Sequence, residues 1–229
     1  MANQRHNALI TLTNPRSPIS EAYRTLRTNL EFSSLDRSLR TMVVTSAGPE
    51  EGKSTTLANL AVTLAQAGKQ VILVDCDLRR PSQHQIFGVR NDRGFTTMLV
   101  VDEAMKNPPL QDTRAPGLRL LPSGPLPPNP SELLGSQRME EIIASLTKNA
   151  DIVLFDAPPV IAVTDAAVLA SKVDGVLLVI NAGKTKRDHA QKAKALLEKV
   201  NARLVGAVLN NVKFDTSLHR YYAEQEQTT

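Results

Sequence analysis

The chain has 229 residues, and its 27 Lys and Arg against 23 Asp and Glu give a formal net charge of +4. With 41% hydrophobic and 22% charged residues, the composition is that of an ordinary globular domain and excludes disorder over the whole length. A single cysteine excludes an internal disulfide framework and is typical of a reducing compartment. Because positive and negative charges are mixed along the chain, we expect no nucleic-acid partner.

In chain order, helix-like and strand-like segments alternate over the first third. We expect a helix at about residues 18–34, followed by a strand at the apolar run 41–45. Residues 54–67 are rich in Ala and Leu and end before Gly68, which is typical of the C-terminus of a helix. The apolar run at residues 70–75 predicts a second strand.

The middle of the chain interrupts this alternation. Residues 108–130 contain eight prolines, which exclude a helix and argue against a central strand. We expect a long surface connection there rather than a docking motif for a proline-binding partner, with one weak strand at 118–121. Beyond it, Ser131 as a cap and the helical spacing of apolar residues predict a helix over 131–148.

The last third returns to the alternating pattern. Apolar runs at 151–156, 175–181 and 204–210 predict strands, and residues 186–200 predict an amphipathic helix with lysines on one face. Nearly continuous apolar runs are typical of strands that are buried on both faces of a parallel sheet. The sequence therefore predicts a doubly wound, mainly parallel α/β sheet in a single domain over residues 1–212.

The termini and the apolar runs carry no sign of a membrane or secretory segment. The longest apolar runs, such as Val176–Ile180, are too short to span a bilayer, and the N-terminus lacks the apolar core of a secretory signal. We therefore expect a cytoplasmic protein. The polar tail at residues 213–229 has no helical or strand periodicity, and we expect it to be flexible.

A phosphate-binding loop follows the first predicted strand. Residues Ala47 to Ser54 read A-x-x-x-x-G-K-S, the phosphate-loop pattern with Ala in place of the first Gly. Small residues let backbone N–H groups close around a phosphate, while Lys53 brings a charge to the β- and γ-phosphates and Ser54 a hydroxyl to Mg²⁺. We therefore expect ATP and Mg²⁺ here. The nucleotide-binding residues of this loop would be Ala47, Gly48, Pro49, Glu50, Glu51, Gly52, Lys53, Ser54 and Thr55.

Carboxylates mark the ends of two predicted strands. Asp75 and Asp77 follow the second strand, and Asp156 ends a later one. Ligands of open α/β sheets bind beyond the carboxyl ends of the strands, so these carboxylates should converge on the phosphates held by Lys53. One acidic group is expected to hold Mg²⁺, and a second can orient or deprotonate an attacking hydroxyl. The motifs alone therefore indicate an ATP-dependent phosphotransferase or an ATPase.

In the order of its motifs, the chain resembles the bacterial tyrosine kinases, the cytoplasmic kinases of capsule and exopolysaccharide synthesis. AGPEEGKST matches that family's Walker A motif, VILVDCDLR its Walker A′ motif, and IVLFDAPP its Walker B motif. Upstream, EAYRTLR places Glu21, Arg24 and Arg27 at the spacing of the family's E-x-x-R-x-x-R motif. The resemblance extends from about Pro15 to Tyr222.

The resemblance implies roles for the residues of these motifs. Arg79, which closes the Walker A′ motif, would join the nucleotide-binding residues. Asp75 would be the candidate for activating a tyrosine hydroxyl, although the roles of the three carboxylates are interchangeable on the sequence alone. The implied metal ligands are Ser54, Asp77 and Asp156. The implied catalytic residues are Lys53, Asp75, Asp77 and Asp156.

It also implies a contact between subunits. In such kinases the E-x-x-R-x-x-R motif belongs to a ring-forming interface, so we expect the helix at 18–34 to make a homo-oligomeric contact. A local Glu–Arg pair on a solvated helix face is the plainer alternative. We expect Tyr221 and Tyr222 to accept phosphate from the active site of a neighbouring subunit, although the family usually has a longer tyrosine cluster. Tyr23 lies within the expected helix, and we expect it to be structural.

The implied partners lie at the inner face of the cell membrane. A membrane-embedded polysaccharide co-polymerase would act as activator, and a cognate tyrosine phosphatase would reverse the reaction. Three rivals stay open. A partitioning or cell-division switch ATPase usually has a Lys where this chain has Gly48, a metal-cluster carrier needs a C-x-x-C pair, and a non-catalytic ATP-binding scaffold contradicts nothing in the sequence.

Overall fold

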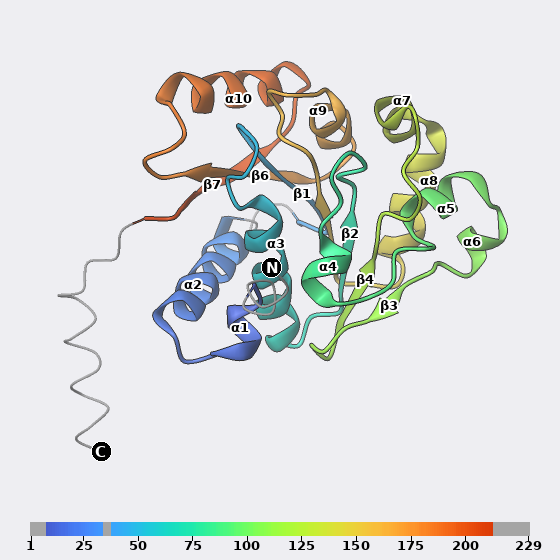
Figure 1. Cartoon of the computed structure of the whole chain (residues 1–229), viewed down its shortest axis with the longest axis horizontal. Coiled ribbons are helices and arrows are strands. Elements are labelled where there is room, and N and C mark those ends of the chain that lie inside the picture. The colour runs from blue at the N-terminus through green and yellow to red at the C-terminus, as the bar shows by residue number, and fades with distance from the viewer. Residues whose placement is uncertain (1–7, 34–37, 213–229) are drawn as a thin grey trace.

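The computed structural model describes residues 8–33 and 38–212 (Figure 1). Its strands form one sheet in the order β3-β4-β2-β5-β1-β6-β7, parallel except for the antiparallel pair β3 and β4. The strands are β1 (Thr41–Ser46), β2 (Val71–Asp75), β3 (Gln111–Asp112), β4 (Leu118–Leu121), β5 (Ile152–Asp156), β6 (Gly175–Asn181) and β7 (Leu204–Asn210). The helices are α1 (Ile10–Thr13), α2 (Pro18–Ser33), α3 (Lys53–Gln66), α4 (Gln83–Phe87), α5 (Phe95–Val100), α6 (Glu103–Lys106), α7 (Pro130–Gly135), α8 (Gln137–Thr147), α9 (Asp165–Ala170) and α10 (Arg187–Lys199). The predicted fold class is confirmed.

Alternate residues of the central strands build two hydrophobic layers, one on each face of the sheet. Met42 and Val44 of β1 belong to a buried cluster with Leu57 of α3. Val43, between them, belongs to a second buried cluster with Leu169 of α9. Figure 1 shows α2 and α3 on one side of the strands and α9 and α10 on the other. With both faces covered, the carboxyl edge of the sheet is the place left for a ligand.

The expected helix at residues 18–34 is present as α2, which ends at Ser33, the last residue described before a gap. It is the longest helix of the described part, with 16 residues. No helix there is both long and apolar enough to cross a membrane.

The strand β7 departs from the expected burial on both faces. Each of its residues is partly buried or exposed, and Leu209 is 58% exposed. In the described part of the chain β7 has a neighbour on one side only, the strand β6. An apolar run therefore predicted the strand correctly and its environment wrongly, because composition does not distinguish an edge strand from a central one.

Three further corrections concern the chain from residue 108 onward. The proline-rich segment is not only a surface connection, because the weakly predicted β4 is largely buried inside it and pairs in parallel with β2. The short β3 was not expected at all. The predicted helix over 131–148 is two helices, because Ser136 is extended and its side chain accepts a hydrogen bond from the Met139 N–H, which caps α8.

The strand register brings the acidic strand ends to one level. Asp156 at the end of β5 is the Cα partner of Asp75 in β2 on one side and of Val44 in β1 on the other. Two residues beyond Val44, β1 ends at Ser46 and leads into the phosphate loop. Asp156 therefore lies between the loop and the Walker A′ strand, as the sheet argument predicts.

Candidate active site

The phosphate loop connects β1 to α3 through a backbone that requires glycine. Gly52 has a φ of 88°, and a Cβ at this position would collide with the side-chain amide of Asn210. The same amide donates a hydrogen bond of 3.0 Å to the Glu51 carbonyl. Glu50 also has a positive φ, 59°. The end of β7 thus contacts the loop directly, which the sequence did not reveal.

The side chain of Glu51 folds back and holds the loop together. Its carboxylate accepts the Ala47 N–H at 3.0 Å and the Thr185 hydroxyl at 2.6 Å. Thr185 lies between β6 and α10, so this bond joins the loop to the neighbouring strand end. Only 5% of Glu51 is exposed. Its contacts show that it shapes the loop.

Lys53 lies between two carboxylates. Its Nζ is 2.9 Å from Asp77 Oδ2, 3.0 Å from Asp156 Oδ1 and 3.1 Å from the Ser54 hydroxyl. Burial alone would lower the pKa of Lys53, but the charges of Asp156 and Asp77 outweigh it and raise the pKa above its ordinary value. The lysine is therefore an ammonium at neutral pH, the state that attracts a phosphate.

Asp75 supports the turn that carries Asp77. It is fully buried and accepts the backbone N–H groups of Ser82 and Gln83 at 2.9 Å and of Asp77 at 3.3 Å. Burial and the charge of Asp156 raise the pKa of Asp75 to about 8. Of the three predicted carboxylates, this one faces the most backbone donors.

The oxygen atoms around Lys53 suit Mg²⁺. Ser54, Asp77 and Asp156 each bring one oxygen to within 3.1 Å of the same ammonium nitrogen. Mg²⁺ is usually bound by one or two carboxylates together with substrate phosphates and water. Within the described residues, no group of three or more His, Cys, Asp and Glu side chains is placed to hold a metal by itself. The donor set therefore fits a metal that arrives with a nucleotide.

Comparison with known proteins gives this site a family. The ParA family model, described as NUBPL iron-transfer P-loop NTPase, matches residues 38–223, and a P-loop NTPase fold implies nucleotide binding. The chain is 45% identical to tyrosine-protein kinase YwqD of Bacillus subtilis, over 95% of this chain and 92% of that protein. The chain belongs to the bacterial tyrosine-protein kinases.

A longer relative and a solved kinase domain agree. The kinase is 33% identical to tyrosine-protein kinase etk of Escherichia coli over 91% of its own length and 29% of that longer protein. It also matches the solved kinase domain of Escherichia coli ETK with a TM-score of 0.85 and 32% identity, covering 90% of this chain and 81% of that one. These matches favour the kinase interpretation over the switch ATPase.

The chemistry of the single cysteine argues against the interpretation as a metal-cluster carrier. The kinase has one cysteine, Cys76, which is fully buried between the two aspartates of the Walker A′ motif. Burial and the surrounding carboxylates raise the pKa of the Cys76 thiol well above its ordinary value. A lone protonated thiol is a poor ligand for an iron–sulfur cluster, which is held by several thiolates.

The Walker A′ arginine of the kinase is anchored at α9. Arg79 donates hydrogen bonds of 2.9 and 3.1 Å to the two oxygens of Asp165, a fully buried residue. The Ser131 hydroxyl donates a third to Asp165 at 2.6 Å. A nucleotide contact of Arg79 stays a prediction, and its observed contacts join the turn after β2 to α7 and α9.

Sequence reasoning missed Gln83, the first residue of α4. Its side chain is fully buried and contacts Asp156 and Ser54. Its position, six residues after Asp77 and outside every recognised motif, carried no signal. Only the fold of the intervening turn brings it to the site.

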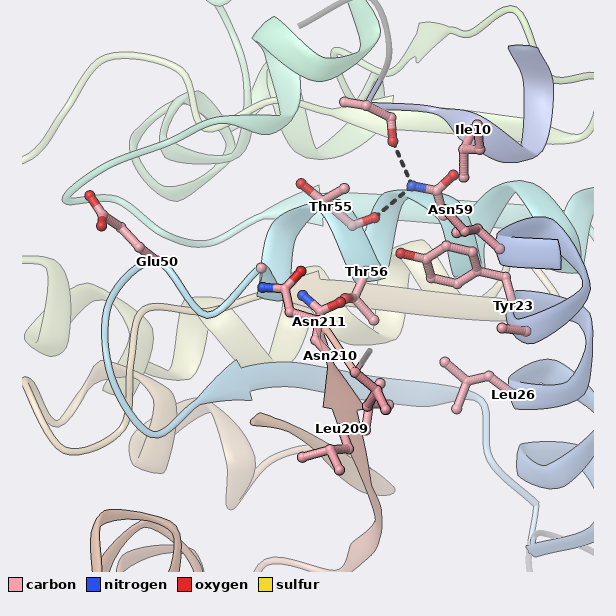
Figure 2. Close-up of a pocket in the computed structure, with 16 residues that line it drawn as sticks. Ile10, Tyr23, Leu26, Glu50, Thr55, Thr56, Asn59, Leu209, Asn210 and Asn211 are labelled. Carbon is pink, nitrogen blue, oxygen red and sulfur yellow. Dashed lines mark hydrogen bonds between the residues drawn. The ribbon is translucent and has the colours of Figure 1, made fainter. Parts of the chain in front are cut away.

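A pocket of about 820 Å³ opens beside the phosphate loop (Figure 2). Its walls come from α2, the first turns of α3 and the end of β7. Tyr23 reaches from α2 toward α3, and burial raises the pKa of this phenol. Asn210 and Asn211 line the pocket at β7, and Gly52 joins it to the loop.

The three residues of the E-x-x-R-x-x-R motif have different surroundings in α2. Arg24 pairs with Glu21 in the same helix and donates a hydrogen bond to the Pro15 carbonyl at 2.7 Å. Arg27 donates to the Thr63 carbonyl at 3.1 Å and so fastens α2 to α3. The oligomer contact stays a prediction for all three.

The predicted acceptors Tyr221 and Tyr222 lie outside the described residues. The same holds for the whole tail at 213–229. The division into a domain over 1–212 and a flexible tail therefore stays a prediction.

Proposed function

We propose that this kinase transfers the γ-phosphoryl group of ATP to Tyr221 and Tyr222 in the tail of a neighbouring copy. The observation that supports the proposal most is the position of Lys53, which meets Asp77 and Asp156 at the end of a phosphate loop. A lysine charge, carboxylates and a hydroxyl gathered around one point are the groups that phosphoryl transfer uses.

Each group has a task in this reaction. Lys53 and the N–H groups of the loop bind the phosphates, and Mg²⁺, when bound, supplies further neutralisation of their charge. Ser54 and Asp156 are the residues that would hold the metal, with Asp77 as a further candidate. The phenolic oxygen attacks the γ-phosphorus, the bond to the β-phosphate oxygen breaks, ADP leaves, and a carboxylate takes the phenolic proton.

Asp77 suits the role of proton acceptor better than Asp75. The oxygens of Asp75 are taken up by the backbone N–H groups that close its turn. One oxygen of Asp77 accepts the Arg80 N–H, whereas the other faces Lys53 at the reacting end of the site. A nucleotide phosphate that pairs with Lys53 releases this second oxygen for the phenol.

The adenosine half of ATP fits the pocket beside the loop. The pocket meets the loop at Gly52 and Thr55. Ile19 and Leu209 give it apolar walls, and Asn211 adds an amide at the rim. Pockets for flat apolar ligands with polar edges have this mixture of surfaces.

The proposal includes a setting at the inner face of the cell membrane. A homo-oligomer formed through α2 brings a tail to a neighbour's site, and the exposed Glu21 and the partly buried Arg24 can pair across such a contact. A membrane-embedded polysaccharide co-polymerase activates the kinase, a tyrosine phosphatase reverses it, and the cycle regulates polysaccharide synthesis and export. This setting is supported by the length of Escherichia coli etk, since the region matched by this chain is only 29% of that protein and the rest of that protein is further sequence.

Phosphosite mapping by mass spectrometry after incubation with Mg-ATP tests the proposal, with a cytoplasmic segment of the co-polymerase added. We expect phosphate on Tyr221 and Tyr222, and none after Lys53→Met. The double variant Tyr221→Phe/Tyr222→Phe should still bind ATP. Hydrolysis of ATP without any phosphotyrosine would instead support a switch ATPase, and binding without hydrolysis would support a scaffold.

A further inference from the structure

Gln83 donates hydrogen bonds to two of the three carboxylates of the site, those of Asp75 and Asp156. Its side-chain Nε2 donates to Asp156 Oδ2 at 2.8 Å and to the Ser54 carbonyl at 3.1 Å. Its backbone N–H donates to Asp75 Oδ2 at 2.9 Å. A single buried residue at the start of α4 therefore joins the Walker A, A′ and B segments.

The orientation of this amide is fixed by its surroundings. Both atoms that Nε2 contacts, on Asp156 and Ser54, are oxygen acceptors, so the reversed amide would set oxygen against oxygen. This leaves Oε1 of Gln83 pointing elsewhere. Oε1 is buried and has no hydrogen-bond partner among the described residues. Buried polar atoms are nearly always paired, so an orphaned acceptor in an acidic site calls for a donor that arrives with the ligand.

We propose that Gln83 is a positioning residue that couples Mg²⁺ binding to nucleotide binding, an inference that rests on the proposed function of this site. Its Nε2 holds Oδ2 of Asp156, so that Oδ1 stays turned toward Lys53 and Ser54. Its Oε1 accepts a hydrogen bond from a water of the Mg²⁺ shell. Mg²⁺ keeps several of its waters in such sites, and each water needs an acceptor.

A core glutamine that only fills space would behave differently. Its replacement would change stability, and would change nucleotide affinity equally with and without magnesium. A positioning residue for the metal affects only the part of nucleotide affinity that Mg²⁺ adds. Partners that orient a metal's ligands typically change metal affinity by about 10–100-fold when removed.

The test is titration of the full-length protein with a fluorescent ADP analogue, in EDTA and over a range of Mg²⁺ concentrations. The variant Gln83→Met keeps the volume and removes the amide. Gln83→Asn keeps an amide that is too short for both contacts, and serves if the methionine variant unfolds. The matched control is Gln85→Met, which changes an exposed glutamine in the same helix. Thermal melts monitor folding of each variant.

We expect Gln83→Met to raise the apparent dissociation constant for Mg²⁺ about tenfold or more, with ADP affinity in EDTA within about twofold of wild type. The apparent dissociation constant of Gln83→Asn for Mg²⁺ should lie between those of wild type and Gln83→Met. The control Gln85→Met should match wild type. An unchanged Mg²⁺ dependence in Gln83→Met, or an equal loss of affinity with and without Mg²⁺, would overturn the inference. A wild-type protein that fails to bind the analogue in Mg²⁺ would overturn the proposed function itself.

Discussion

At the scale of the residue, Lys53 balances carboxylates that would otherwise be buried as unpaired charges. Replacement by Met leaves Asp77, Asp156 and Asp75 close together without a cation. We expect Lys53→Met to lose about 3–5 kcal/mol of unfolding free energy at pH 7 without nucleotide, as for other buried pairs with one partner removed. Urea unfolding measures this, with the exposed Lys192→Met as control. Equal stability of Lys53→Met and wild type would show that the carboxylates do not depend on the lysine.

A second prediction at this scale concerns Asp165. Burial alone would raise the pKa of Asp165, but the hydrogen bonds from Arg79 and Ser131 and the arginine's charge lower it below its ordinary value. A folded-state pKa below the unfolded value contributes stability above the unfolded pKa, and this is lost as pH falls through the folded pKa. We expect Asp165→Asn to cost about 1–3 kcal/mol at pH 7, less than a fully buried pair because Arg79 is half-exposed.

Unfolding of Asp165→Asn and wild type from pH 7 down to acid pH separates the ionic contribution from packing. The difference between the two proteins should shrink as the pH falls, because the wild-type carboxylate becomes protonated. A difference that stays constant over the whole range would contradict the assigned pKa shift.

At the scale of the element, the loop between β1 and α3 depends on contact with the end of β7. A side chain at Gly52 meets both an unfavourable φ and the amide of Asn210. We expect Gly52→Ala to weaken ADP binding more than tenfold, since a left-handed conformation alone costs a non-glycine residue about 1–2 kcal/mol. The double variant Gly52→Ala/Asn210→Ala should recover only part of the affinity. Full recovery, measured by calorimetric titration, would show that the collision alone matters and the backbone conformation does not.

The elements also show what the sequence predicts well. Apolar runs predicted the strands β1, β2, β5, β6 and β7, because burial in a parallel sheet demands long apolar stretches. The break at Ser136 was missed, since the apolar residues on either side of it keep the spacing of one continuous helix. The short helices α4, α5, α6 and α9 were missed as well, because segments of four to six residues show no clear periodicity.

At the scale of the whole molecule, the site forms where three parallel strands end side by side. Lys53, Asp77 and Asp156 were predicted to converge because the carboxyl ends of such strands share one edge. In the structure, one oxygen of Asp77 and one of Asp156 each lie within 3.0 Å of Lys53 Nζ. Gln83 and Asn210 were not predicted. Their contacts depend on how a turn and an edge strand fold back onto the loop, which no local pattern encodes.

The central claim is that one copy of the kinase phosphorylates the tail of another. The direct measurement mixes two inactive halves in the presence of Mg-ATP and the co-polymerase segment. One half is Lys53→Met with its tail intact, and the other is Tyr221→Phe/Tyr222→Phe with its active site intact. We predict phosphate on the tail tyrosines of the Lys53→Met chain, detected by mass spectrometry, at a rate that rises with the concentration of the second chain. Wild-type protein that becomes phosphorylated while this mixture does not would contradict transfer between copies.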